Sequence, residues 1–220
     1  MSAARDLLAT IRRELAPVEE ALRAHPYLDA LEAGRVPESS LASFAGEQYS
    51  ILTSDRRSFA QLAARFPGPP AGDLFLAIAE GEGEAVSRLL SLAAQLGLDE
   101  GGLRAYEPEP GGQAYTAFVS WLALNGSRAD VALAFLANLA AWGASCARMA
   151  HGLRGEYGLG DEAVAFFDFF AEQPPEFEAR ALAVAEAGLQ EGESPARARR
   201  AARLLQAYEL MFWDTLGAQL

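Results

Sequence analysis

The amino-acid sequence predicts an all-α protein. Alanine, leucine, glutamate and arginine, the strong helix formers, dominate the chain. Valine and isoleucine are sparse, and no stretch alternates apolar and polar residues as a half-buried strand does. Several segments instead carry apolar residues three and four apart. Because no composition shift or long linker divides the chain, we expect one helical-bundle domain covering residues 1–220.

Prolines and glycines divide the chain into the expected helices. In chain order, we expect helices at about Ala3–Arg23, Tyr27–Leu31, Pro37–Phe66, Asp73–Leu96, Gln113–Asn125, Arg128–Leu153, Asp161–Glu172, Pro174–Leu189 and Pro195–Leu216. Pro17 should kink or split the first helix, because proline removes a backbone donor. The segment Glu107–Gly112 (EPEPGG) is expected to be a loop.

Residue chemistry also predicts how several helices begin and end. Ser127, Asp161 and Ser194 are predicted N-caps, since their side-chain oxygens can accept from free backbone amides. Gly126 and Gly160 are predicted helix stops.

Composition excludes several classes of function. All 18 basic residues are arginine, so Schiff-base chemistry and a P-loop lysine are excluded. One cysteine and two histidines exclude a zinc site built from these residues. A net charge of −12 argues against binding to nucleic acid or an anionic membrane. No apolar run is long and uncharged enough for a membrane span or a secretory signal, and a lone cysteine suits the reducing cytosol. We therefore expect a cytoplasmic location.

Two polar residues interrupt the apolar stripe of the long helix around residues 39–66. Gln48 and Asp55 occupy positions where apolar residues are expected. Burying such groups costs about 1–3 kcal/mol each unless they are bonded. They either belong to a satisfied polar network or line a cavity. Glu47 and Tyr49 flank Gln48, so we expect at least one of them to face the same interior region.

Glu209 gives the strongest chemical signal in the sequence. Helical spacing places it on one face with Leu205, Phe212 and Trp213. A carboxyl group among these residues should be desolvated, which raises its pKa toward the range of a general acid or base. The alternative is an ion pair with an arginine across a helix interface.

Other chemistry-bearing residues have simpler interpretations. Tyr115 and Trp142 are either core aromatics or ligand contacts, and Cys146 on an apolar stripe is interpreted as a buried structural thiol. His25, before a proline at a helix break, is interpreted as part of a turn. The acidic residues Glu80, Glu82 and Glu84 alternate with glycine and are interpreted as a solvated face.

Three segments resemble the TenA/thiaminase II family and its pyrroloquinoline-quinone-synthase relatives. They are HPYLDALEAGRVPESSLASFAGEQY (His25–Tyr49), AYTAFVSWLALNGSRADVALAFLANLAAW (Ala114–Trp142) and YELMFWD (Tyr208–Asp214). Their order and spacing agree with the family over nearly the whole chain. The resemblance implies a heme-oxygenase-like helical bundle that assembles as a homodimer or homotetramer.

The resemblance also implies roles for individual residues. Glu209 matches the family's catalytic glutamate, Trp213 follows it in the motif, and Tyr115 falls at a pocket tyrosine. The family's nucleophilic cysteine aligns with Ala140, and its pyrimidine-binding aspartate aligns with Gln48. A subclass without the cysteine relies on glutamates, so Glu47 could serve with Glu209.

A second branch of the same fold binds two iron ions through carboxylate and histidine ligands. Here Glu82 keeps the first glutamate, but Leu89, Phe170, Pro174 and Phe177 stand at the other ligand positions. These residues cannot hold iron as that branch does, and neither His25 nor His151 sits at the family's heme position. We therefore expect no metal and no cofactor.

Two main hypotheses of function follow. The chain is a cysteine-independent, metal-free hydrolase of an aminopyrimidine or thiamin-related compound, or a catalytically silent binding or regulatory relative. A metal-dependent oxidase is a third alternative. We expect the catalytic candidates Glu209 and Glu47 to converge on one pocket for a small heterocycle, with Glu209 the most buried carboxyl group. The expected binding residues are Gln48, Tyr49, Tyr115, Trp142 and Trp213.

Overall fold

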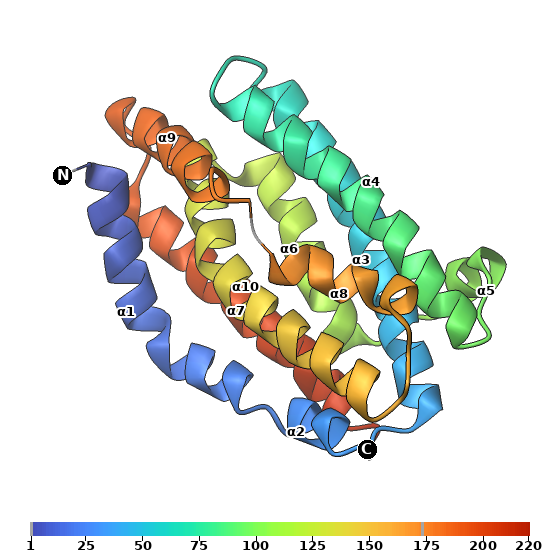
Figure 1. Cartoon of the computed structure of the whole chain (residues 1–220). Coiled ribbons are helices and arrows are strands. Elements are labelled where there is room, and N and C mark those ends of the chain that lie inside the picture. The colour runs from blue at the N-terminus through green and yellow to red at the C-terminus, as the bar shows by residue number, and fades with distance from the viewer. Residues whose placement is uncertain (1, 173) are drawn as a thin grey trace.

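The structure, a computed structural model, describes residues 2–172 and 174–220, and within them the chain forms helices and no strand. The helices are α1 Ala3–Arg23, α2 Pro26–Glu32, α3 Glu38–Arg65, α4 Ala71–Gln95, α5 Glu100–Ala105, α6 Pro110–Asn125, α7 Arg128–Gly155, α8 Asp161–Ala171, α9 Phe177–Gln190 and α10 Pro195–Gly217 (Figure 1). The predicted all-α class is confirmed.

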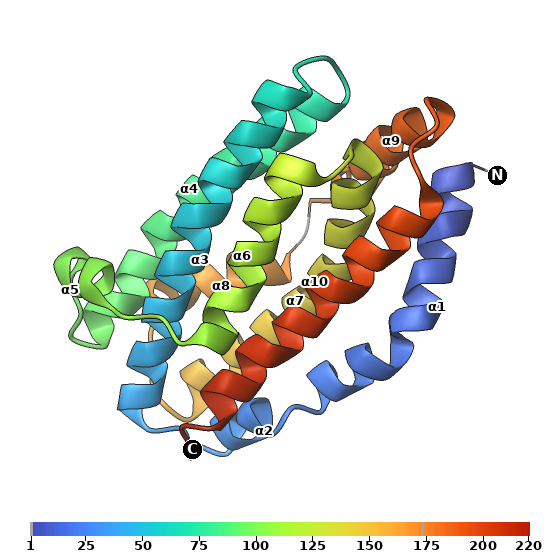
Figure 2. The same ribbon diagram turned by 180° about the vertical axis from the view of Figure 1, so that it is seen from behind.

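Six helices form a closed ring. Each of the pairs α4–α3, α3–α6, α6–α10, α10–α7, α7–α8 and α8–α4 is in contact. Helices α3 and α4 lie side by side in both views, with α6 next to α3 in the view from behind (Figures 1 and 2). The remaining helices cover this ring from outside, with α1 and α9 packing on α7. The ring determines where an interior cavity can form.

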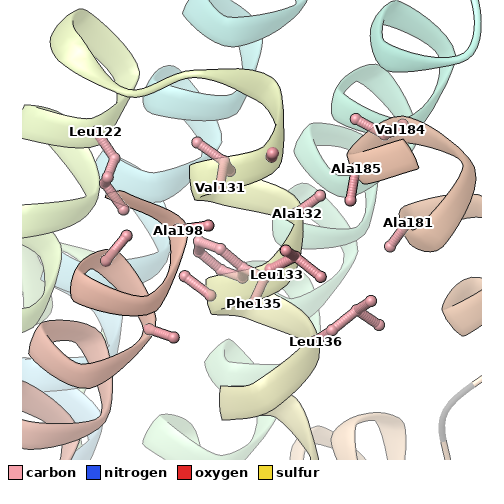
Figure 3. Close-up of a cluster of buried hydrophobic side chains, with 14 of the residues drawn as sticks. Leu122, Val131, Ala132, Leu133, Phe135, Leu136, Ala181, Val184, Ala185 and Ala198 are labelled. Carbon is pink, nitrogen blue, oxygen red and sulfur yellow. The ribbon is translucent and has the colours of Figure 1, made fainter. Parts of the chain in front are cut away.

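The apolar core has two parts. The first gathers small and aliphatic side chains of α7 with those of α6, α9 and α10. Figure 3 shows side chains of α7 between Leu122 of α6 and Ala198 of α10 on one side and Ala181, Val184 and Ala185 of α9 on the other. The second is aromatic: the Phe44 and Phe167 ring centres, for example, lie 5.2 Å apart. Burying such a side chain contributes about 1.5–3 kcal/mol. Tyr115 packs against both parts, so it lies where they meet.

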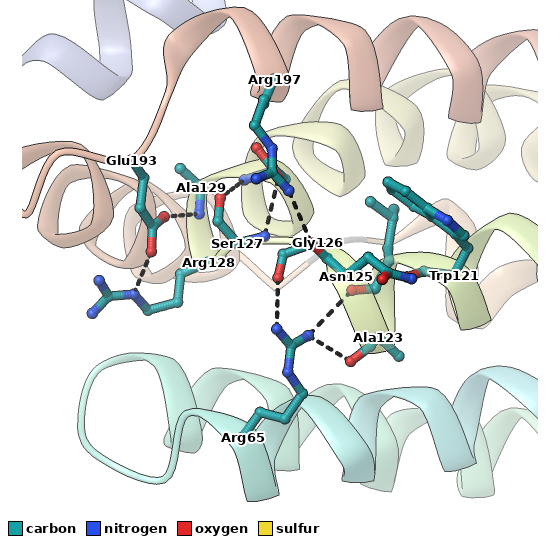
Figure 4. Close-up of polar contacts among 12 residues, drawn as sticks. Arg65, Trp121, Ala123, Asn125, Gly126, Ser127, Arg128, Ala129, Glu193 and Arg197 are labelled. Carbon is teal, nitrogen blue, oxygen red and sulfur yellow. Dashed lines mark hydrogen bonds and ion pairs between the residues drawn. The ribbon is translucent and has the colours of Figure 1, made fainter.

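The connection between α6 and α7 is fixed by polar contacts (Figure 4). Ser127 and Asp130 form a capping box: each side chain accepts from the other's backbone amide, at 3.2 and 3.0 Å. Arg65 donates to the Gly126 carbonyl at 3.1 Å, and Arg197 pairs with Asp130 at 3.2 Å. The predicted stop at Gly126 and N-cap at Ser127 are confirmed. Since this turn sets the start of α7, it also sets the position of the cavity residues that α7 carries.

The expected loop at Glu107–Gly112 is wrong in its second half, because α6 begins at Pro110. Proline is favoured in a first helical turn, where its missing N–H is not needed. Gly112 allows close packing there: a Cβ atom at this position would overlap the carboxylate of Glu47, which would have to shift. The proline and glycines that predicted a loop therefore mark the tightly packed start of a helix.

Other boundaries also differ from the predictions. Gly160, and not Asp161, is the N-cap of α8, and α9 begins at Phe177 instead of Pro174. Ser194 is the N-cap of α10, as predicted, although its side chain makes no capping bond. Helix α1 continues through Pro17, so this proline does not split it.

Helix α7 is apolar on nearly all sides. Among the described helices it alone is long and apolar enough to cross a membrane, and 83% of its most apolar window is buried inside the bundle. A helix that is hydrophobic all round is typical of a buried core position. The burial of α7 is therefore that of a core helix.

Candidate functional site

A cavity of about 50 Å³ lies inside the ring of six helices. On the same measure a single water molecule needs about 10–15 Å³, so the space exceeds one water. The cavity is lined by Gln48, Ile51, Leu52 and Asp55 of α3, Glu82 of α4, Tyr115 of α6, Phe135, Asn138, Leu139 and Trp142 of α7, Phe170 of α8, and Glu209 and Phe212 of α10. A larger, more open depression of about 400 Å³ adjoins it and shares Glu82, Phe135, Leu139 and Phe170 with it. The shared residues make this depression the natural entrance.

Glu209 presents a desolvated carboxyl group to the cavity. The side chain is 3% exposed and accepts hydrogen bonds from Asn138 Nδ2 and, at 3.5 Å, from Trp213 Nε1. Burial raises the pKa of Glu209 from 4.5 to about 8, against the lowering effect of these two bonds. No arginine pairs with Glu209 among the residues that the structure describes. The prediction of a desolvated carboxyl group is confirmed, and the ion-pair alternative is wrong.

A short hydrogen-bonded chain holds Glu209 in place. Asn138 Oδ1 accepts from the Tyr115 hydroxyl at 3.0 Å, and Asn138 Nδ2 also contacts Gln206 Oε1 at 3.3 Å. Burial raises the pKa of Tyr115 well above its ordinary value, and the nearby Asp55, Glu209 and Glu82 carboxyl groups raise it further. Tyr115 therefore stays protonated and can donate. Sequence reasoning missed Asn138, the one amide residue of α7, which lies three residues after Phe135 and four before Trp142 of the same lining.

Asp55 and Glu82 bring two more carboxyl groups to the opposite wall. Asp55 is 2% exposed, and the Thr116 hydroxyl donates to its Oδ1 at 2.5 Å. Burial raises the pKa of Asp55 to about 7, against the effect of this bond. Burial also raises the pKa of Glu82 well above 4.5, and the Asp55 charge adds to this. The structure therefore places Asp55 in the wall of a cavity, one of the two surroundings expected for it.

The interpretation of the acidic residues on α4 as a solvated face is wrong for one of them. Glu80 and Glu84 are exposed, but Glu82 is half-buried and lines both the cavity and its entrance. Its neighbours Gly81 and Gly83 carry no side chain, so no apolar stripe marks a buried face here. The sequence could therefore not show whether the Glu82 side chain faces inward.

Gln48 and Trp142 line the cavity, as expected. Gln48 is 4% exposed, and within the described part of the chain its side chain makes no hydrogen bond. Its amide therefore faces the cavity unpartnered. The Trp142 ring meets Phe170 and Phe212 edge to face, at 5.8 and 6.1 Å between centres. Together these residues give the cavity an aromatic, mostly apolar lining that also carries polar groups.

The expected convergence is wrong for Glu47 and Tyr49. Glu47 accepts from the Tyr106 hydroxyl at 3.0 Å and from the Glu109 amide at 2.7 Å, and Tyr49 donates to Glu100 at 3.0 Å. Successive helical residues point about 100° apart, so the neighbours of Gln48 turn away from the cavity that Gln48 faces.

Glu209 is also not the most buried carboxyl group, contrary to expectation. Glu47 is 0% and Asp55 2% exposed, against 3% for Glu209. Glu47 reaches this burial in the packing between α3 and the start of α6, outside the cavity.

The residues of the C-terminal motif YELMFWD lie in different surroundings. Phe212 lines the cavity, whereas Trp213 is fully buried behind Glu209 and does not line it. Asp214 accepts from His25 Nε2 at 3.2 Å, and His25 Nδ1 accepts from the Tyr27 amide as the N-cap of α2. The interpretation of His25 as a turn residue is confirmed.

No thiol lines the cavity. Ala140, the expected counterpart of the family's cysteine, is exposed on α7, and the cavity-lining positions beside it are Asn138 and Leu139. Cys146 is 1% exposed and lies outside the lining residues. Burial, with a smaller contribution from Glu209, raises the pKa of Cys146 well above its usual value. A thiol in this state is a poor nucleophile.

The residues present do not fit the di-iron centre of the related branch. Leu89 is buried in the aromatic core and, like Phe177, has no donor atom. In the described ranges, no three His, Cys, Asp or Glu side chains are grouped so as to hold a metal ion.

Comparison with solved structures places this fold among TenA homologues. A TenA homologue from Pyrococcus horikoshii OT3 superposes with a TM-score of 0.79 at 17% identity, covering 97% of this chain and 99% of that one. A putative TenA-like thiaminase from Sulfolobus solfataricus has a TM-score of 0.68 at 13% identity, covering 99% and 97%. Heme oxygenase-1 from the cyanobacterium Synechocystis, in complex with heme, has a TM-score of 0.68 at 14% identity, covering 96% and 91%. At these identities the likeness shows the heme-oxygenase-like fold alone.

Sequence comparison gives the family. No curated protein matches the chain significantly. The sequence model of the TENA/THI-4/PQQC family matches residues 12–217, nearly the whole length. This chain therefore belongs to the TENA/THI-4/PQQC family.

Proposed function

We propose that the cavity binds a small, planar nitrogen heterocycle and that Glu209 transfers protons in its metal-free hydrolysis. The proposed substrate class is an aminopyrimidine or a thiamin-related compound. The observation that carries the proposal is the Glu209 carboxyl group, which lines an aromatic cavity with its pKa raised to about 8. A group whose pKa lies near neutrality can both give and take a proton.

The cavity walls match a flat ring. Trp142 and Phe212 supply aromatic surfaces, and Gln48 offers both an amide donor and a carbonyl acceptor. A ring nitrogen next to an exocyclic amino group needs such a pair. Trp213, expected to bind substrate, instead stabilises Glu209 from behind through its indole N–H.

In the proposed reaction, water replaces an amine on the carbon that carries it. Glu209 in its acid form donates its proton to the departing nitrogen as the carbon–nitrogen bond breaks. The resulting carboxylate then accepts a proton from the attacking water as the carbon–oxygen bond forms, which returns Glu209 to its starting state. Asn138 and Trp213 donate hydrogen bonds to the carboxylate and so stabilise the charge that appears on it.

A paired binding and turnover experiment tests this proposal. A thermal-shift screen with thiamin and aminopyrimidine fragments identifies the ligand, and chromatography measures its hydrolysis. Glu209→Gln keeps the side-chain volume, so binding should persist while turnover falls at least about 100-fold. Glu80→Gln is the matched control, because Glu80 is exposed and lies outside the cavity, and it should keep full turnover. Undiminished turnover by Glu209→Gln would contradict the proposed role.

The absence of a thiol from the cavity lining supports a second candidate, a binding or regulatory protein without catalysis. In that case the same fragments bind, but the wild-type chain does not consume them.

We also propose a cytoplasmic protein that forms a homodimer or homotetramer. Support comes from exposed apolar side chains, among them Trp121, Leu124 and Met211, which are 51%, 66% and 42% exposed. Light scattering at micromolar concentration tests the assembly, and a mass of 23.5 kDa, that of one chain, would contradict it.

A further inference from the structure

The ionisable groups that line the cavity include carboxyl groups but no basic group. Asp55, Glu82 and Glu209 line it, and none of the lining residues is basic. Arg56 lies next to Gly83, outside the lining, and Arg88, in the entrance, pairs with Glu84. Three carboxyl groups in a desolvated space have no internal counter-ion, which costs free energy whenever they ionise.

A second observation points to a ligand on the α3–α4 wall. Gln48 is 4% exposed, faces the cavity from the same helix as Asp55, and has no hydrogen-bond partner in the described residues. Buried amides are bonded in the great majority of cases. Glu82 likewise makes no hydrogen bond or ion pair within the described ranges, and only Oδ1 of Asp55 is bonded, to Thr116. Among the described residues, Gln48, Asp55 and Glu82 thus each bring an acceptor atom without a partner to the same cavity.

We propose that Asp55 and Glu82 form a carboxylate clamp that selects a ligand carrying a planar, positively charged nitrogen group of the amidinium type. Such a group has N–H donors on two nitrogens in one plane, which suits acceptors on facing helices. Its charge supplies the counter-ion that the protein lacks. The aromatic surfaces of Phe135, Trp142 and Phe212 then stack on the rest of a flat cation.

The entrance to the cavity also favours a positively charged ligand. Its lining adds Asp168 and Glu172 to Glu82, against Arg88 alone; Asp168 is paired with Arg154, which leaves Glu172 and Glu82 as the unpaired acids within the described residues. The Arg88 guanidinium lies 5.1 Å from the Phe169 ring centre and is paired with Glu84, so its charge is partly offset. With a net charge of −12 over the whole chain, the electrostatic field favours the entry of a cation over an anion.

The proposed clamp requires, as the proposed function does, that the cavity binds a ligand. It does not require that the protein is catalytically active. Binding is therefore measured with two probes of nearly equal shape, benzamidinium and neutral benzamide, by calorimetry. We expect benzamidinium to bind wild-type protein at least about tenfold more tightly, which corresponds to about 1.4 kcal/mol. In Asp55→Asn and in Glu82→Gln this ratio should fall toward one, while Glu80→Gln should retain it.

Dependence on pH gives a second readout. The charged and titratable groups that line the cavity with Asp55 and Glu82 are Tyr115 from α6 and Glu209 from α10. Those that line the entrance with Glu82 are Arg88 of α4, Asp168 of α8 and Glu172. Because burial raises the pKa of Asp55 to about 7, the clamp is mostly protonated in acid and ionises as pH rises. Affinity for benzamidinium, which stays charged throughout, should therefore increase from about pH 5 to about pH 8, and affinity for benzamide should not.

The outcomes separate the two proposals. Equal affinity for both probes, no binding of either, or a ratio unchanged in Asp55→Asn overturns the clamp. If wild-type protein hydrolyses none of the aminopyrimidine or thiamin fragments but retains the charge preference, the hydrolase proposal fails and the clamp stands.

Discussion

Replacing Glu209 by glutamine should change how the stability of the protein depends on pH. In the folded protein the pKa of Glu209 is raised to about 8, against 4.5 for an ordinary glutamate. Between these two pH values the unfolded chain has released the proton and the folded chain has kept it. Folding stability contributed by this group is therefore complete below about pH 4.5 and is lost as pH rises toward 8.

The size of the effect follows from the shift. Each pH unit between the two pKa values costs about 1.4 kcal/mol of unfolding free energy, so about 3 kcal/mol is lost between pH 4.5 and pH 7. Glutamine has the same shape and does not ionise, so the variant lacks this loss. The unfolding free energy of Glu209→Gln minus that of wild type should thus grow by about 3 kcal/mol over this range. Groups common to both proteins, including the acidic surface, cancel in the difference.

Urea unfolding followed by far-ultraviolet circular dichroism measures this difference at several pH values. Ionic strength and protein concentration are held constant, because both affect apparent stability. Glu80→Gln, the exposed control on α4, should show a difference that does not vary with pH. A flat difference for Glu209→Gln between about pH 5 and pH 7 would show that Glu209 is not held as a desolvated acid.

Three further predictions concern other parts of the bundle. Gly112→Ala should lower the unfolding free energy in urea titration, because the new methyl group overlaps the Glu47 carboxylate and must displace it; equal stability would refute the close packing. Ser127→Ala removes half of the capping box with Asp130 and should cost about 1 kcal/mol in the same titration, and a cost near zero would contradict a stabilising role for this cap. Cys146 should react with an aromatic disulfide reagent only as fast as the protein unfolds, since the thiol is buried and its pKa is raised; rapid labelling of the native protein would contradict this.

Helical periodicity was enough to predict the all-α fold and the orientation of Glu209. The spacing of Leu205, Phe212 and Trp213 around it is a local property of one helix. The sequence therefore determines that the carboxyl group lies on the same helix face as these apolar residues. The same holds for Gln48 and Asp55, whose place on an apolar stripe already showed that they face inward. The cap at Ser127 is likewise encoded within four residues.

The position of Glu82 was decided only by the tertiary structure. Its neighbours Gly81 and Gly83 carry no side chain, so no periodic pattern marks a buried face, and the residue resembles a surface acid. The packing of α3 and α8 against α4 places it in the cavity wall with Asp55 and shields it partly from solvent. Its raised pKa follows from that desolvation first and from the Asp55 charge second.

Glu47 shows the opposite case, a buried carboxyl group whose partners the sequence cannot identify. Its neighbour Gln48 lines the cavity, but the helical rotation between them directs Glu47 to Tyr106 and the Glu109 amide, 59 and 62 residues away in the chain. Residue type and local period determine that a polar group is buried. Which distant groups meet it depends on how the helices close into a ring, because desolvation and hydrogen bonding are properties of the assembled neighbourhood.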